Sequence, residues 1–202
     1  NPVNDAPTLE DVADTTAEDT DFVLELNGTD IDGDALTFLA SVDANGSAGI
    51  DGSTLTVTPD ADYNGTLSVN VIASDGQGSG SATLTLDVTP VNDAPVLTTI
   101  SDVSFDEDED EDQEGLDSRT IVLSANDIDG DQTNFLINGE LYAQVGEINA
   151  QIYDSGDVNP DLPVILVFSA SENYNGSETF TVSVSDGEYS DSQSITVTVN
   201  AV

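Results

Sequence analysis

Apolar residues recur at every second position over short stretches of the chain, with Thr and Ser at many of the positions between them. This alternation predicts half-buried antiparallel β-strands, and the Gly, Asn and Asp residues between the runs predict turns. Residues 164–168 are apolar without a break, which predicts a strand covered on both faces. No stretch keeps a helical period. The pattern therefore predicts an all-β protein built as a β-sandwich. The alternating positions are Phe22, Leu24 and Leu26; Leu36, Phe38 and Ala40; Leu55 and Val57; Leu67, Val69, Val71 and Ala73; Leu84, Leu86 and Val88; Ile121 and Leu123; Phe135 and Ile137; Phe180, Val182 and Val184; Ile195, Val197 and Val199.

Several short motifs occur twice in the same order. The string Pro-Val-Asn-Asp-Ala-Pro opens the chain at residues 2–7 and returns at 90–95. Three further motifs return after it: Asp-Ile-Asp-Gly-Asp at 30–34 and 127–131, Tyr-Asn-Gly at 63–65 and 174–176, and Ser-Asp-Gly at 74–76 and 185–187. Such recurrence predicts a tandem repeat of two domains, residues 1–91 and 92–202. The second copy is longer and has insertions around residues 106–114 and within 132–169.

Composition adds an unusual charge. The 202 residues include 41 acidic residues and one basic residue, Arg119, which gives a formal net charge of −40. Such a chain cannot neutralise phosphates, so nucleic acids and anionic membranes are excluded as partners. Acidic chains with few aromatic residues are often disordered, but the ordered alternation of apolar positions favours a folded protein. Self-repulsion would loosen a compact fold unless cations neutralise it.

The acidic residues gather at the turns between the predicted strands. Carboxylates on loops, with Asn and backbone oxygens nearby, are the hard oxygen ligands that Ca²⁺ requires. His and Cys are absent, so zinc and copper lack their usual ligands. An EF-hand loop is excluded, because counting from Asp30 places Ala35 where the invariant Gly belongs and Ser41 where the Glu belongs. A calcium site would therefore be assembled from separate loops. The long acidic run at 106–112 is expected to be a disordered loop with few ligands.

The motifs resemble a known family. Residues 71–76, followed by an alternating strand and Val-Asn-Asp-Ala-Pro at 91–95, resemble the end of a cadherin repeat. Residues 123–129 are similar to the Asp-x-Asp loop that opens the calcium site of the next repeat. The chain as a whole resembles the cadherin-like tandem repeats of large bacterial surface adhesins and of polysaccharide-associated proteins. This resemblance implies two seven-stranded Greek-key β-sandwiches of Ig-like or cadherin-like type, with Ca²⁺ held between consecutive repeats.

The resemblance also implies which residues bind the metal. The set implied at the linker between the two domains is Glu18, Asp60, Asp62, Asn92, Asp93, Asp127, Asp129, Asp131 and Asp186. A second set, for a junction with an upstream repeat, is Asn4, Asp5, Asp30, Asp32, Asp34 and Asp75. A downstream set would use Glu107, Asp108 and Glu172. Pro90 and Ala94 stand where cadherin linkers carry further ligands, so one or two ions are expected instead of three.

Catalysis is not expected. The chain has no His, Cys or Lys to act as a base, a nucleophile or a Schiff-base former. Paired carboxylates could hydrolyse a glycoside, but they would need a substrate cleft that a small sandwich without Trp does not readily form. We therefore expect a binding or structural protein. No apolar run is long enough to span a membrane, and no signal peptide opens the chain, which begins within a linker motif as an excised piece of a longer protein would.

Two functions remain open at this stage. The first is a calcium-binding repeat of an extracellular, cell-surface adhesin, in which Ca²⁺ at the linker makes the array rigid. Its partners would be neighbouring repeats of the same chain, and the protein would act as a monomer. The alternative is a calcium-dependent carbohydrate-binding module pair of a secreted protein, with a polysaccharide or cell-surface ligand. Tyr142, Tyr153 and Tyr189 are its candidate contacts, although tyrosines also commonly cover strand surfaces. Tyr63 and Tyr174 are instead expected to be corner tyrosines that bond nearby backbone.

Overall fold

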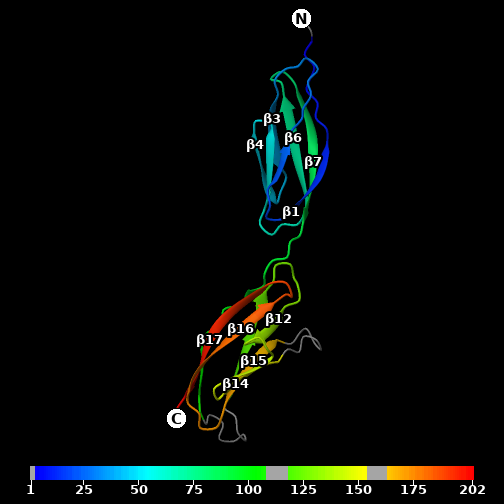
Figure 1. The fold of residues 1–202 in the computed structure, drawn as a ribbon. Coiled ribbons are helices and arrows are strands. Elements are labelled where there is room, and N and C mark those ends of the chain that lie inside the picture. The colour runs from blue at the N-terminus through cyan, green and yellow to red at the C-terminus, as the bar shows by residue number, and fades with distance from the viewer. Residues whose placement is uncertain (1–2, 108–117, 154–162) are drawn as a thin grey trace. The chain divides into compact units, whose positions relative to one another are not determined.

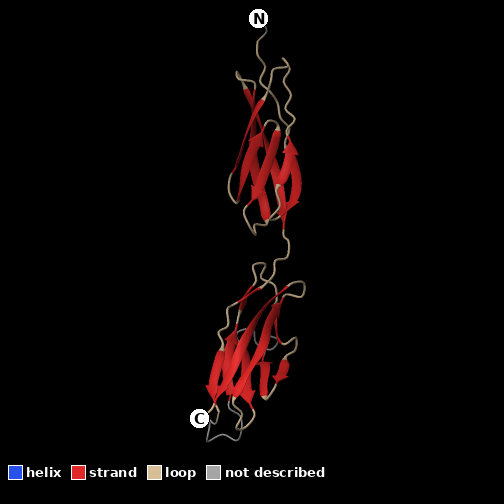
Figure 2. Cartoon of the chain, turned by 60° about the vertical axis from the view of Figure 1, so that its left-hand side comes forward, coloured by secondary structure: helices blue, strands red, loops and turns tan. Residues whose placement is uncertain are grey.

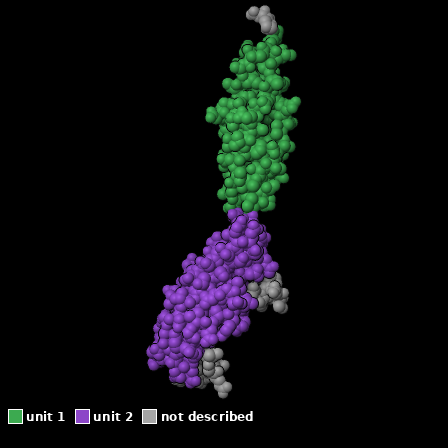
Figure 3. All heavy atoms as spheres, in the orientation of Figure 1, with its two compact units in different colours: residues 1–91 green, residues 92–202 purple. Residues whose placement is uncertain are grey.

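The computed structural model describes residues 3–107, 118–153 and 163–202, and its regular elements are all β-strands. The chain divides into two compact units, residues 1–91 and 92–202, coloured separately in Figure 3. No helix in the described part of the chain could cross a membrane. The prediction of an all-β fold is confirmed.

Unit 1 is a sandwich of two sheets (Figures 1 and 2). One sheet has the strand order β1-β7-β6-β3 and the other has the order β2-β5-β4. The strands are β1 (Val12–Ala17), β2 (Phe22–Glu25), β3 (Thr37–Val42), β4 (Gly46–Asp51), β5 (Thr54–Pro59), β6 (Gly65–Ser74) and β7 (Ser79–Thr89). The first strand pairs in parallel with the last, whereas the other pairs are antiparallel. This arrangement is the predicted Greek-key sandwich.

The core of unit 1 follows from the alternation of its strands. Along β6 and β7, every second side chain is buried between the sheets. The buried apolar cluster consists of Leu55, Val57, Leu67, Val69, Val71, Leu84, Leu86 and Val88. Phe22, Leu24 and Leu26 are half-buried and pack against it. Removal of these side chains from water is the main force that stabilises the unit.

Unit 2 repeats this architecture with additional strands. Its sheets have the orders β12-β16-β17-β9 and β10-β15-β14-β13, and a short third pair joins β11 to β8. The strands are β8 (Val96–Leu97), β9 (Val103–Asp106), β10 (Ser118–Leu123), β11 (Ala125–Asn126), β12 (Asn134–Ile137), β13 (Tyr142–Val145), β14 (Ile148–Tyr153), β15 (Val164–Ala170), β16 (Gly176–Ser185) and β17 (Ser190–Asn200). Because β14 occupies the place of β4, strand β13 is an extra edge strand without a counterpart in unit 1.

The core of unit 2 is larger and contains more aromatic residues. The rings of Phe168 and Phe180 are fully buried, with their centroids 5.4 Å apart and their planes tilted by 57°. In β15 the inward Leu166 and Phe168 are buried, but the outward Ile165 and Val167 are only half-buried, as is the inward Val164 at the start of the strand. The expectation that residues 164–168 are covered on both faces is therefore met on the inner face and only partly on the outer face. On the outer face, the side chains of β15 are covered only by those of the neighbouring strands β10 and β14.

Candidate metal-binding loops

In unit 1, the loop that follows β2 is organised by one aspartate. The Oδ1 atom of Asp30 accepts hydrogen bonds from the backbone N–H groups of Asp32 at 2.9 Å and Asp34 at 3.2 Å. Gly33 has a φ of +78°, a left-handed conformation that glycine adopts without strain. Asp bonding to its own backbone in this way forms a tight loop. The loop therefore presents its remaining carboxylate oxygens outward from a fixed backbone.

Two other segments of unit 1 join this loop. The backbone N–H of Asp5 donates to Asp32 Oδ2 at 2.8 Å, and Asn4 Nδ2 donates to Asp75 Oδ2 at 2.9 Å. The pKa of Asp75 is lowered, first by the backbone N–H of Gly78 and then by Asn4. The predicted second set, Asn4, Asp5, Asp30, Asp32, Asp34 and Asp75, is thus gathered at one end of the unit, with the Asp34 carboxylate exposed.

Unit 2 repeats the same network. Asp127 Oδ1 accepts the backbone N–H groups of Asp129 at 3.1 Å and Asp131 at 3.2 Å. Asp93 donates its N–H to Asp129 Oδ2 at 2.8 Å, and Asn92 Nδ2 donates to Asp186 Oδ2 at 2.9 Å. The Asn92 bond is the main cause that lowers the pKa of Asp186. Six of the nine residues implied for the linker site therefore lie together at the start of unit 2, and among them the Asp131 carboxylate is exposed.

The two loops share an unusual feature. The Oδ2 atoms of Asp30 and Asp127 are buried and, within the described residues, accept no hydrogen bond. A buried polar atom without a partner costs about 1–3 kcal/mol, so nearly all such atoms in proteins are paired. The same unpaired oxygen at the same place in both units is a property of the loop and not of one side chain. A hard cation would satisfy it, since carboxylate oxygens are the ligands that Ca²⁺ takes.

A different acidic cluster lies at the other end of unit 1, where β1 and β7 end. Glu18 is only 2% exposed, and charged residues are rarely buried without a partner. Its Oε1 accepts the backbone N–H of Val91 at 2.5 Å, and its Oε2 accepts Asn64 Nδ2 at 3.5 Å. Both donors are neutral. The Glu18 carboxylate thus lacks a cationic partner among the described residues of unit 1.

Two neighbouring turns add further carboxylates to this end of unit 1. The backbone N–H of Asp62 donates to Asp19 Oδ1 at 3.2 Å, and both residues have a φ of +56°. Asp tolerates this left-handed conformation better than most residues. The Asp60 carboxylate is exposed in the same turn. Glu18, Asp60 and Asp62 are the residues that unit 1 was expected to contribute; Asp19 and Asn64 were not predicted as site residues, although Asp19 directly follows Glu18 in an acidic pair.

Unit 2 ends with a reduced copy of the Glu18 arrangement. Glu107 accepts the backbone N–H of Val202 at 3.3 Å and Asn175 Nδ2 at 3.5 Å. Glu107 is therefore the structural counterpart of Glu18, and its expected role as a ligand of a downstream site stays a prediction. Ser171 and Asn173 stand where unit 1 has Asp60 and Asp62, and Glu172 is exposed. Asp108 and most of the acidic run at 106–112 lie outside the described residues.

The repeated tyrosines close the turns at this end of each unit. Tyr63 Oη donates to the backbone carbonyl of Thr66 at 3.2 Å, as expected for a corner tyrosine. Tyr174 departs from the expectation, because its Oη donates to the Glu178 carboxylate at 3.3 Å. Desolvation, followed by the charge of Glu178, raises the pKa of Tyr174. Gly176 lies against the Tyr174 ring, where a Cβ atom would clash.

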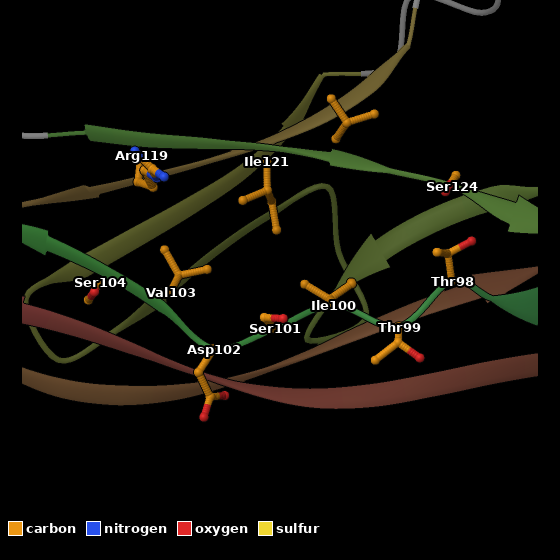
Figure 4. A pocket seen from close by; sticks show the side chains of 11 residues that line it. Thr98, Thr99, Ile100, Ser101, Asp102, Val103, Ser104, Arg119, Ile121 and Ser124 are labelled. Atoms are coloured by element: carbon orange, nitrogen blue, oxygen red, sulfur yellow. The ribbon is translucent and has the colours of Figure 1, made fainter.

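A cavity of about 390 Å³ in unit 2 lies between residues 98–104 and β10 (Figure 4). Its lining includes Arg119, Ile121 and several Ser and Thr side chains. The Asp102 carboxylate points away from the strand that carries Arg119 and accepts the backbone N–H of Thr196 at 2.8 Å. Unit 1 has a cavity of about 560 Å³ at the corresponding place, between residues 8–12 and β2. Both cavities lie between the edges of the two sheets, and the unit 1 cavity has two carboxylates, Glu10 and Glu25, in its lining.

Comparison with known proteins decides the family. The bacterial Ig domain family matches two tandem segments, residues 4–89 and 92–200. The chain belongs to the bacterial Ig domain family. Bacterial Ig domains are typically extracellular or displayed on the cell surface. A comparison with curated protein sequences found no match.

Among solved structures, cadherin repeats have a fold similar to that of these bacterial Ig domains. The EC1-4 fragment of Drosophila N-cadherin is similar at a TM-score of 0.57 and 19% identity, over 98% of this chain and 50% of that chain. An endo-fucoidan hydrolase of glycoside hydrolase family 107 matches at a TM-score of 0.41 and 19% identity, over 100% of this chain and 30% of that chain. Titin domains z1z2, solved in complex with telethonin, match at a TM-score of 0.37 and 15% identity, over the full length of both chains. The chain therefore spans half or less of the first two proteins, and the N-cadherin likeness shows the fold alone. The cadherin-like tandem repeat predicted from the sequence is confirmed.

Proposed function

We propose that these bacterial Ig domains form a calcium-binding tandem repeat of an extracellular adhesin, in which Ca²⁺ at the linker makes the array rigid. One observation carries the proposal. In both units a buried oxygen, Oδ2 of Asp30 or Asp127, lies without a hydrogen-bond donor in a loop already bonded to an Asn-Asp pair. A divalent cation supplies what this oxygen lacks.

Chain connectivity supports a site composed from both units. Glu18 binds the backbone N–H of Val91, the last residue of unit 1, and Asn92 and Asp93 follow at once. Since consecutive Cα atoms are about 3.8 Å apart, Val91 and Asp93 cannot be far from one another. The proposed ligands are Glu18, Asp19, Asp60 and Asp62 from unit 1, with Asn92, Asp93, Asp127, Asp129, Asp131 and Asp186 from unit 2.

The ligand types favour calcium over other metals. The proposed set contains only carboxylate and amide oxygens, and Ca²⁺ accepts six to eight oxygen ligands in flexible geometry. Mg²⁺ requires a stricter octahedron and keeps several waters. Without a cation, like charges at the linker repel one another, so the linker bends more easily. With it, the domains are coupled and the chain acts in adhesion as a stiff monomeric spacer between neighbouring repeats, without catalysis.

Small-angle scattering and calorimetry test this proposal. The chain is measured in about 2 mM Ca²⁺ and again in excess EGTA at equal ionic strength. We expect a larger radius of gyration and higher unfolding temperatures with Ca²⁺, because a ligand that binds only the folded state stabilises it. Identical scattering profiles and identical unfolding temperatures in the two buffers would refute the proposal.

The substitution Asp127→Asn tests directly whether the buried Oδ2 atom of Asp127 binds the cation. Asn keeps the Oδ1 acceptor for Asp129 and Asp131 but replaces the unpaired carboxylate oxygen by a neutral amide. We expect calcium affinity to fall by about tenfold or more, a loss of about 1.4 kcal/mol of binding free energy. The unfolding temperature in EGTA should not fall. Asp51→Asn, which removes the same charge from the exposed end of β4, is the matched control and should leave affinity unchanged.

A further inference from the structure

Among the residues that the structure describes, the strands of one exposed sheet face of unit 2 carry no charged side chain on that face. The outward-facing positions of the sheet β10-β15-β14-β13 are Ser118, Thr120, Val122, Ile165, Val167, Ser169, Asn149, Gln151, Tyr153, Tyr142 and Gln144. All are polar and uncharged, apolar or aromatic. The chain has 41 acidic residues, and a sheet face in contact with water can carry acidic side chains at no cost to folding. Their absence from this face is therefore not required by the fold. We call this surface the neutral face.

The corresponding face of unit 1 is acidic. On its sheet β2-β5-β4, Glu25 and Asp51 flank Thr54 in one row of outward side chains. Glu25 accepts hydrogen bonds from the hydroxyls of Ser53 at 3.0 Å and Thr54 at 2.5 Å. The neutral face is therefore specific to unit 2 and is not imposed by the sandwich.

Two tyrosines are the largest side chains of the neutral face. Tyr142 on β13 lies opposite Gln151 on β14, so Tyr153 is its diagonal neighbour, about 7–8 Å away. Tyr142 Oη donates to Asn149 Oδ1 at 2.6 Å, and Tyr153 Oη donates to Gln151 Oε1 at 2.9 Å. Both rings therefore lean along β14 in the same direction. The two side chains remain 52% and 48% exposed, so about half of each is accessible to a ligand from solvent.

The insertion in the second copy enlarges this face. Tyr142 and Gln144 belong to β13, the edge strand that unit 1 lacks. The extra strand thus adds an aromatic ring and an amide to the same surface that has lost its acidic residues.

We propose that the neutral face binds a neutral polysaccharide chain. Tyrosine rings offer flat amphipathic surfaces that can stack on the C–H faces of sugar rings, and the Asn, Gln, Ser and Thr side chains can bond sugar hydroxyls. An anionic polymer or a second copy of this chain would be repelled by a net charge of −40, whereas a neutral glycan is not. The proposal does not rest on calcium, because none of the proposed metal ligands lies on this face.

Retention on insoluble polysaccharides tests the inference. The whole chain is incubated with microcrystalline cellulose, chitin, agarose and insoluble mannan, and with calcium alginate beads as the anionic polymer. Each mixture except the alginate beads is repeated in EGTA. We expect retention on at least one neutral polymer in both buffers and none on alginate. Replacing both rings, Tyr142→Ala with Tyr153→Ala, should reduce the retained affinity about tenfold or more.

Two controls make the result specific. Tyr189, the third tyrosine expected to contact a sugar, lies at the turn before β17 and so belongs to the other sheet. Tyr189→Ala removes a ring that is 47% exposed but lies off the neutral face, and this variant should be retained like the wild type. Gln151→Glu places one charge between the rings and should weaken retention without changing the unfolding temperature. The inference is overturned if no neutral polymer retains the chain, if the double variant is retained equally, or if sedimentation shows a dimer that the double variant loses. Retention that persists in EGTA while the calcium experiment fails would separate this inference from the proposed function.

Discussion

Asp30 and Asp127 each use only one of their two carboxylate oxygens in the hydrogen bonds of the described residues. The motif Asp-Ile-Asp-Gly-Asp predicts acidic loops at both places, because its repetition is visible in the sequence. It does not show that Asp34 and Asp131 contribute backbone N–H groups while their carboxylates stay exposed. Which groups point inward and which stay exposed depends on the left-handed turn at Gly33 and Gly130. Asn64 was missed as a partner of Glu18 for a related reason, since the contact joins residues distant in sequence.

The Asn92–Asp186 contact makes a prediction about acid sensitivity. Because the pKa of Asp186 is lowered from its ordinary value of 3.8, the contact stabilises unit 2 fully above pH 3.8 and is lost as the pH falls below it. In EGTA, Asn92→Ala should raise the Asp186 pKa toward 3.8, measured by NMR titration of the carboxyl carbon. Asn4→Ala should shift Asp75 less, because the Gly78 N–H is the larger cause there. An unchanged Asp186 pKa in Asn92→Ala would contradict the assignment.

At the scale of elements, the period of two predicts most strands because burial between two sheets imposes it. The division of the first strand of unit 2 into β8 and β9 was not predicted. Residues 98–102 pass from one pairing partner to another, and Gln193 bonds the backbone N–H and carbonyl of Ile100 there. Strand β13 was also not predicted, since Tyr142, Ala143, Gln144 and Val145 form an alternation too short to distinguish from a loop.

The separate cores predict independent unfolding. Phe180→Ala removes a fully buried ring that packs against Phe168, and such substitutions cost about 3–5 kcal/mol. In EGTA, calorimetry should show a lower unfolding temperature for unit 2 and an unchanged transition for unit 1. Leu67→Ala, in the core of unit 1, should give the reverse pattern. One transition that shifts as a whole in both variants would show that the units unfold together.

At the scale of the whole molecule, the net charge of −40 opposes compactness. Both units fold in spite of it because their apolar residues lie in two continuous cores. The sequence alone shows the charge but not its arrangement. Among the described residues, the carboxylates proposed as metal ligands lie at the ends of the units, and none lies on the neutral face.

Salt should therefore stabilise both units. In EGTA, raising NaCl from about 10 mM to about 150 mM shortens the screening length from roughly 30 Å to roughly 8 Å and should raise both unfolding temperatures. At equal ionic strength, millimolar Ca²⁺ should raise them further than Mg²⁺, because only Ca²⁺ suits the proposed ligand set. An equal rise in unfolding temperature with Ca²⁺ and with Mg²⁺ would mean that the cations act only by screening the negative charges.

The parallel pairing of the first and last long strands has a mechanical consequence. In unit 1, all six residues of β1 pair with β7, and in unit 2 all four residues of β9 pair with β17. Because each pair is parallel, tension applied at the two ends of a unit pulls its strands along one another. The backbone hydrogen bonds are then strained together, in shear, and do not open one at a time. A domain built in this way resists stretching, and the shorter pairing makes unit 2 the weaker of the two under force.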